Sequence, residues 1–291
     1  MPSVPARAAI LLTALLFSTG GAAIKAVSLT SWQIASLRSG VAAAVLLLAV
    51  RKLPRLTAPT ALVGAAYAAT LVTFVTANTL TTAANAVFLQ AAAPLYIALL
   101  APWLLGEHLR RRDLPVLAAI AAGMALLVAG SGAPTVTAPN RALGNAVGLV
   151  SGVCWSLTVM GLRWIAKRDP HAGGIAAGSA ALTGNIIACL ATLPLALPLH
   201  AVAPRDAAGI AYLGLFQVGL AYVLLTRAIR HVPAVDASLL LLLEPALSPL
   251  WAWLLHREAP GFWPLLGGAC ILGATVRKTW REAKASLDGG T

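Results

Sequence analysis

Residues 85–107 are NAVFLQAAAPLYIALLAPWLLGE, and residues 236–258 are DASLLLLLEPALSPLWAWLLHRE. These two stretches are copies of one pattern, and they decide the fold. When the chain is shifted by 151 residues, Asn85–Ile120 aligns with Asp236–Ile271, and 10 of the 36 positions are identical. Self-similarity at one fixed offset indicates an internal repeat.

Two pairs of matches carry most of the information in a sequence so rich in Ala and Leu. Pro94 aligns with Pro245, and Glu107 aligns with Glu258. Each copy therefore combines a proline in the middle of an apolar segment with a glutamate at its end, at the same spacing. We expect the two copies to form equivalent helices in two halves of the molecule.

The whole chain around the repeat is apolar. Of its 291 residues 59% are hydrophobic and only 10% are charged, and the mean hydropathy is +0.84. This leaves too little polar surface to cover a soluble globule, so we expect lipid to be the solvent. Lipid cannot satisfy backbone groups, and the apolar runs do not alternate, so the spans are helices rather than barrel strands. We therefore expect an all-α polytopic membrane protein.

Ten apolar runs, bounded by charges, prolines or glycines, predict ten transmembrane helices. They lie near residues 8–24, 32–50, 60–80, 83–105, 114–130, 144–163, 174–197, 208–226, 235–255 and 262–280. The first run follows Arg7 and ends in small residues, which resembles a secretory signal peptide. We expect it to be retained, because it gives the two halves equal numbers of spans.

Lys and Arg residues divide unevenly between alternate loops. One set of loops and chain ends holds 16 of them, and the other set holds four, which are Lys25, Arg141, Arg205 and Arg257. The positive-inside rule predicts that the richer side is cytoplasmic, so both termini face the cytoplasm, in a bacterial inner membrane. The net charge of +12 is thus explained by topology, and we expect no nucleic-acid partner.

The ten spans divide into two halves of five. We expect a first repeat over residues 1–130, a linker over 131–143, a second repeat over 144–280 and a cytoplasmic tail over 281–291. Five is an odd number, so the second half enters the membrane from the opposite side and the repeats are inverted. Inverted repeats of this kind are typical of secondary transporters.

These residues resemble the drug/metabolite transporter superfamily and its EamA-type domain. The resemblance rests on the proline followed by Leu104-Leu105-Gly106-Glu107, on its degraded second copy ending at Glu258, and on the arginine in Ser36-Leu37-Arg38. The second copy lacks the glycine, and the seventh span has no arginine equivalent to Arg38. The resemblance covers essentially the whole chain. Within the superfamily, the length and span count look most like the amino-acid and metabolite exporters, in particular those for aromatic amino acids.

Two charged residues lie deep within predicted spans. Glu244 is the only acid well inside a span, and Arg38 lies six residues after Trp32. An intramembrane ion is costly and is a functional hypothesis by default. Glu244 could bind a substrate ammonium group or take up a proton, or it could be hydrogen-bonded beside the helix break at Pro245. Arg38 could bind a substrate carboxylate, or it could brace the bundle.

Other candidate substrate-binding side chains are aromatic or neutral and polar, and they lie on four predicted spans. They are Phe74 and Asn78, Asn85 and Tyr96, Trp155 and Thr158, and Gln217 and Tyr222. A mostly apolar lining with a few hydrogen-bonding groups suits amino acids or similar small metabolites. Each of these side chains could instead be core packing. We expect Pro94 and Pro245 to be hinges.

The sequence lacks the motifs of competing functions. It contains no HExxH or GxSxG motif, so we do not expect an enzyme, and it contains no phosphate loop for primary pumping. Cys154, Cys189 and Cys270 are isolated, so we expect no metal, no disulfide and no cofactor. A multidrug or organic-cation exporter remains the main alternative, and a channel is a further one. We expect a monomer in the lipid bilayer that carries a small-molecule substrate.

Overall fold

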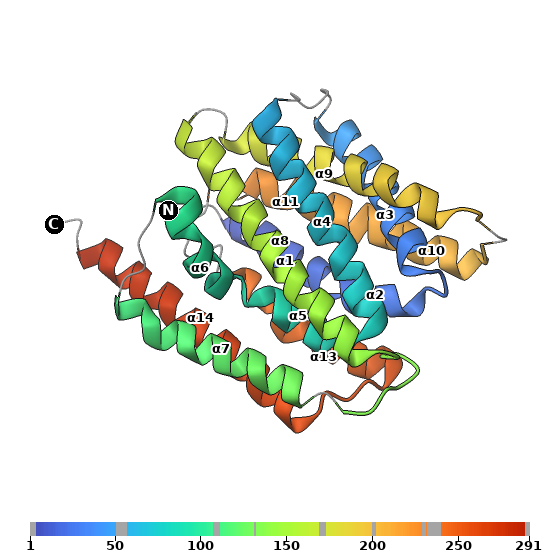
Figure 1. Cartoon of the computed structure of the whole chain (residues 1–291). Coiled ribbons are helices and arrows are strands. Elements are labelled where there is room, and N and C mark those ends of the chain that lie inside the picture. The colour runs from blue at the N-terminus through green and yellow to red at the C-terminus, as the bar shows by residue number, and fades with distance from the viewer. Residues whose placement is uncertain are drawn as a thin grey trace.

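The computed structural model describes residues 4–50, 57–106, 111–130, 132–168, 173–199, 202–228, 231 and 240–288. Within these ranges every regular element is helical, apart from an isolated bridge between Thr135 and Ala138 (Figure 1). Glu107 and residues 235–239, which belong to the predicted repeat, lie outside the described residues.

The first part of the chain forms a series of helices that follows the predicted spans. They are α1 (Val4–Ser18), α2 (Gly20–Ala26), α3 (Ser31–Val50), α4 (Ala58–Leu80), α5 (Ala83–Ala91), α6 (Ala93–Leu105), the short 3-10 helix η1 (Arg111–Asp113) and α7 (Leu114–Ala129). The second part contains α8 (Arg141–Arg168), α9 (Gly173–Ala196), α10 (Pro204–Tyr212), the π-helix η2 (Leu213–Leu220), α11 (Ala221–Ala228), α13 (Leu243–His256) and α14 (Phe262–Asp288).

Seven helical segments are long and apolar enough to cross a membrane, which supports a polytopic membrane protein. They are Ala6–Ala26, Ser31–Ala49, Ala58–Leu80, Ala83–Leu104, Arg141–Leu162, Ala177–Ala196 and Pro204–Ala228. Helix α7 is a shorter apolar helix, and the described parts of α13 and α14 do not meet the same criterion. The arrangement of ten spans as two inverted repeats therefore stays a prediction.

The repeated proline marks a helix break in both copies. Helix α5 ends at Ala91 and α6 begins at Ala93, which places Pro94 in the first turn of the new helix. Likewise α13 begins at Leu243, with Pro245 in its first turn. A proline is tolerated there because the amide groups of a first turn have no intrahelical acceptor. A role for these breaks as hinges remains a prediction.

The end of the repeated helix has the same backbone conformation in both copies. Gly106, with φ of 65°, caps helix α6, and Arg257, with φ of 54°, caps α13. Both residues are in the left-handed region that terminates helices. Gly106 adopts this conformation without strain, whereas Arg257 adopts it despite its Cβ. The shared cap sets the direction in which the chain continues after each helix.

Glycines permit close approach of helices from the two parts of the chain. Helices α7 and α14 lie side by side along one edge of the bundle (Figure 1). A Cβ added at Gly123 would lie 2.6 Å from the Gly267 carbonyl oxygen, and one at Gly267 would lie 2.5 Å from that of Gly123. Small residues that let helix backbones touch are typical of membrane bundles.

Gly144 and Gly152, two turns apart on α8, also permit close packing. A Cβ at Gly144 would lie 2.6 Å from the Thr81 nitrogen, and one at Gly152 would lie 2.4 Å from the ring of Tyr96. Helix α8 thereby packs against α4, α5 and α6 of the first part, and α9 packs against α3 and α4. The two parts of the chain are interleaved rather than separate.

Candidate functional site

Arg38 occupies the middle of α3 and is only 1% exposed. Its Nη2 donates to the Leu71 carbonyl of α4 at 3.0 Å, and its Nη1 donates to Gln217 Oε1 at 3.4 Å. Its Nε is buried without a hydrogen-bond partner. Among the described residues, no carboxylate forms an ion pair with this guanidinium. The arginine thus has hydrogen-bonding capacity that its neighbours do not use.

An irregular helix presents Gln217 to Arg38. Gln217 lies in the π-helical segment η2, which is inserted between α10 and α11 within one span. Such π segments shift the register of side chains and are frequent at functional sites. The segment packs closely on α3, because a Cβ at Gly214 would lie 2.5 Å from the Cβ of Val41. Gln217 also packs against Gly20, the first residue of α2.

Aromatic rings form one wall beside Arg38. The ring of Tyr222 lies 5.3 Å from that of Tyr67 and 5.4 Å from that of Phe17, and both pairs are tilted. Trp155 packs with Tyr222 against the same apolar cluster, which also includes Tyr67. Arg38 interacts electrostatically with both tyrosines. We refer to Arg38, Gln217, Tyr67, Tyr222 and Phe17 as the arginine layer.

Glu244 lies near this layer. It is in the first turn of α13, is half-buried, and interacts electrostatically with Tyr222. Tyr222 thus lies near both Glu244 and Arg38, the two charged residues that were predicted to lie deep in the membrane. The structure therefore brings five of the predicted site residues into one neighbourhood, which are Arg38, Trp155, Gln217, Tyr222 and Glu244.

The remaining predicted residues lie elsewhere or are engaged within their own helices. Phe74 packs in an apolar cluster with Ile24 and Ile34, and Asn78 donates to the Phe74 carbonyl at 3.0 Å. Thr158 donates to the Cys154 carbonyl at 2.9 Å.

Two predicted residues of the fourth span are also placed away from Arg38. Tyr96 packs on Gly152 of α8, and Asn85 belongs to a second polar group, described below. Asn85 and Tyr96 therefore lie where α5 and α6 contact α8, and the structure does not bring them together with Arg38.

Sequence reasoning did not select Tyr67, Phe17 or Asn185 as site residues. The Tyr67 hydroxyl and Asn185 Oδ1 are both buried, and the two residues lie in or near the contact of α4 with α9. Tyr67 is followed on α4 by Thr70, Phe74 and Asn78 at spacings of three or four residues, which place them on one helical face, and this spacing was the available signal. Asn185 and Phe17 gave no signal, because single polar or aromatic residues are common in apolar helices.

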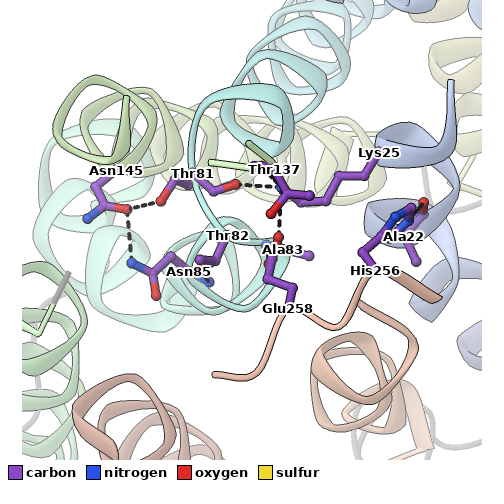
Figure 2. A network of polar contacts seen from close by, with 10 residues as sticks. All are labelled: Ala22, Lys25, Thr81, Thr82, Ala83, Asn85, Thr137, Asn145, His256 and Glu258. Atoms are coloured by element: carbon purple, nitrogen blue, oxygen red, sulfur yellow. Dashed lines mark hydrogen bonds and ion pairs between the residues drawn. The ribbon is translucent and has the colours of Figure 1, made fainter. Parts of the chain in front are cut away.

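A second polar group, which we call the lysine cluster, lies at one end of the bundle (Figure 2). Lys25, near the end of α2, forms an ion pair with Glu258 Oε2 at 3.1 Å, and the two side chains are only 3% and 6% exposed. Lys25 Nζ also donates to the Thr81 carbonyl at 2.8 Å and to the Thr137 carbonyl. Glu258 Oε1 accepts the Ala83 backbone N–H at 2.6 Å.

Neutral side chains extend this cluster along α8 and α5. Thr81 Oγ1 donates to Asn145 Oδ1 at 2.8 Å, and Asn85 Nδ2 donates to the same oxygen at 3.0 Å (Figure 2). His256 Nε2 lies 2.8 Å from the Ala22 carbonyl oxygen. The lysine cluster therefore joins α2, the turn between α4 and α5, the linker, α8 and the end of α13.

The described part of the chain contains no group of three or more His, Cys, Asp or Glu side chains that could hold a metal ion. The chemistry available at the arginine layer is thus that of a guanidinium with spare donors, an aromatic wall and a nearby carboxylate. Such a set can bind a small molecule that combines an anionic group with an apolar body.

Comparisons with known proteins address the family. No curated protein matches the sequence. A solved structure described only as "Crystal structure of protein" matches with a TM-score of 0.62 at 21% identity, covering 96% of this chain and 98% of that one. At this identity the match shows a shared fold. The model of the EamA-like transporter family matches residues 5–129 and again residues 142–277. The chain therefore belongs to the EamA-like transporter family.

Proposed function

We propose that the protein is a secondary transporter that exports amino acids, aromatic ones among them, or related small metabolites across a bacterial inner membrane. The membership of the EamA-like transporter family supports transport, and the predicted topology supports an orientation with both termini in the cytoplasm. The exported substrate class is our inference from the arginine layer.

The observation that carries the proposal is the buried Arg38. A charged side chain inside an apolar bundle is costly unless it is paired. Arg38 donates hydrogen bonds to the Leu71 carbonyl and to Gln217 Oε1, and it has no carboxylate partner among the described residues. A substrate carboxylate would supply the missing charge and accept the remaining donors.

The surroundings of Arg38 suit the rest of an amino acid. Tyr67, Tyr222 and Phe17 offer an aromatic wall for an apolar or aromatic side chain. Glu244, close to Tyr222, offers a carboxylate for the substrate ammonium group. The two charged residues would thus bind the two charged ends of a zwitterion.

Alternating access would follow from two inverted five-helix repeats. Two observations support this arrangement: α3 packs on α9 and α7 packs on α14, which pairs equivalent helices of the two halves. The repeated helices also share a proline in the first turn and a left-handed cap. In such transporters one bundle rocks against the other around a central site.

The test is uptake of labelled Phe, Trp, Thr, Met and a lipophilic cation into proteoliposomes, with and without a pH gradient. We expect saturable amino-acid transport whose efficiency falls strongly in Arg38→Gln and is retained in Arg205→Gln, whose side chain is exposed. Transport of the cation alone, with dependence on Glu244, would replace this proposal by a multidrug or organic-cation exporter.

A further inference from the structure

We propose that Lys25 and Glu258 form a latch that holds one end of the bundle closed and must break whenever that end opens. The inference rests on the proposed alternating access, and it concerns the lysine cluster rather than the substrate site. It assigns a gating role to a residue pair that lies at the helix ends.

Every contact of the latch joins segments that are distant in sequence. Lys25 belongs to the first part of the chain and Glu258 to the second, and the ion pair between them is 3.1 Å long (Figure 2). The other two partners of the ammonium group are carbonyls of the α4–α5 turn and the linker. None of these contacts lies within one helix, so all of them depend on the closed arrangement of this end.

The burial of the pair supports a closed state. Lys25 and Glu258 are 3% and 6% exposed, although both lie at helix ends, where long charged side chains normally reach water. Three groups surround the lysine ammonium. Glu258 Oε1 accepts the Ala83 N–H, and Oε2 is paired with the ammonium at 3.1 Å but accepts no hydrogen bond. A desolvated ion pair resists separation while it stays buried, whereas in an opened end each ion would be hydrated.

Lys25 lies on a short helical segment that begins at a break, and Glu258 directly follows the cap of another such segment. Helix α2 has seven residues and is separated from α1 at Thr19, and α13 begins after Leu242. The backbone of Arg257, with φ of 54°, turns the chain directly before Glu258. His256 adds a second contact between the same two segments through the Ala22 carbonyl. Short segments that start at breaks can move without unfolding a whole span.

Helix α2 also connects the latch to the arginine layer. Its first residue, Gly20, packs on Gln217, so closely that a Cβ there would lie 2.7 Å from Nε2. Its sixth residue is Lys25. A rearrangement of Gln217 upon binding at Arg38 would therefore press on the same helix that holds the latch.

The experiment measures access to the interior from the side that bears Lys25. Ser248 is 2% exposed and lies beneath the latch, near Gly21. We would introduce a thiol by Ser248→Cys, in a background where Cys154, Cys189 and Cys270 are replaced by Ala, and follow its reaction with a membrane-impermeant methanethiosulfonate in oriented vesicles.

We expect Glu258→Gln to increase the labelling rate from the Lys25 side by about tenfold or more, because removal of one charge shifts the population towards the open end. Gln can still accept the Ala83 N–H, so the variant removes the charge rather than the local fold. Lys25→Met should have the same effect. Arg205→Gln is the matched control, since it removes an exposed cation, and it should leave the rate unchanged.

An unchanged labelling rate in both Glu258→Gln and Lys25→Met, with folding verified by monodisperse size-exclusion profiles, would overturn the latch. This readout needs no substrate. A wrong substrate class would therefore leave the labelling result intact, and a failed latch would leave the transport assay with Arg38→Gln intact.

Discussion

The arginine layer and the lysine cluster both bury a cation, but they treat it differently. Lys25 is surrounded by a carboxylate at 3.1 Å and two backbone carbonyls. Arg38 has a carbonyl at 3.0 Å, a long contact of 3.4 Å to Gln217 and an unpartnered Nε. Glu258 supplies a counter-charge to Lys25, whereas no carboxylate among the described residues forms an ion pair with Arg38.

The contrast distinguishes a buried charge that is paired within the protein from one that is available to a ligand. A protein that uses a buried ion to hold one of its own conformations provides the counter-charge itself, because an unpaired buried ion is costly. A protein that binds a guest through a buried ion has to leave some partners to the guest. The lysine cluster follows the first pattern and the arginine layer follows the second.

The largest expected effect concerns the ion pair of Lys25 with Glu258. Glu258→Gln leaves the Lys25 ammonium without a counter-charge, and we expect it to lower the free energy of unfolding by about 3–5 kcal/mol. The double variant Lys25→Met with Glu258→Gln should lose less than the sum of the two single variants, because the pair is removed together. SDS titration of the purified protein measures both quantities. Additive losses would show that the two side chains are not coupled.

Arg38→Gln should show the opposite balance, with a large effect on transport and a small one on stability. Loss of hydrogen bonds to a charged ligand group is worth about 1.5–3 kcal/mol, so transport efficiency should fall roughly 10- to 100-fold. The free energy of unfolding should change little, because the variant also removes an uncompensated ion. Proteoliposome transport and SDS titration measure the two effects.

A stability loss in Arg38→Gln similar to that of Glu258→Gln, with transport retained by the folded fraction, would contradict this expectation. It would mean that Arg38 braces the bundle. The difference between the surroundings of Arg38 and Lys25 would then not indicate a substrate-binding role for Arg38.

The interface of α7 with α14 gives a reference that contains neither cation. Gly267→Ala would place a methyl group 2.5 Å from the Gly123 carbonyl oxygen, so we expect a loss of about 1–3 kcal/mol through overpacking. Gly273→Ala on the same helix meets nothing within 4 Å and should be neutral or slightly stabilising. Equal thermal stability of the two variants would refute the close contact between these helices.

The smallest expected effect lies at the edge of the lysine cluster. Thr81→Val removes the hydroxyl that donates to Asn145, while Asn145 Oδ1 still accepts from Asn85 and the Thr81 carbonyl still accepts from Lys25. We expect a loss of about 1 kcal/mol in SDS titration and no change in thiol labelling from the Lys25 side. A loss as large as that of Glu258→Gln would show that the neutral contacts, rather than the ion pair, hold this end together.

Much of the fold could be predicted from local patterns. The apolar runs gave helix positions that agree closely with α3, α4, α7 and α9, because the bilayer requires about twenty apolar residues in a span. The repeat between Pro94 and Pro245 marked two helix starts. Three details were not foreseen, which are the break between α1 and α2, the π segment around Gln217 and the continuation of α14 to Asp288. They depend on packing against neighbouring helices or on polar residues that are compatible with either a helix or a loop.

The candidate site, too, could be predicted from the sequence only in part. The sequence by itself identified Arg38 and Glu244, because a charge inside an apolar run stands out wherever the run lies. Only the tertiary structure decided that Gln217, Tyr222 and Trp155 lie near them, while Asn85 joins a different polar group. Likewise the sequence marked Glu258 as one of two repeated glutamates, but the pairing with Lys25 joins positions 233 residues apart.

Composition and periodicity are local properties, and they determine which segments are helices in lipid. Which helix faces meet depends on glycine contacts and helix breaks that act only once the whole bundle is packed.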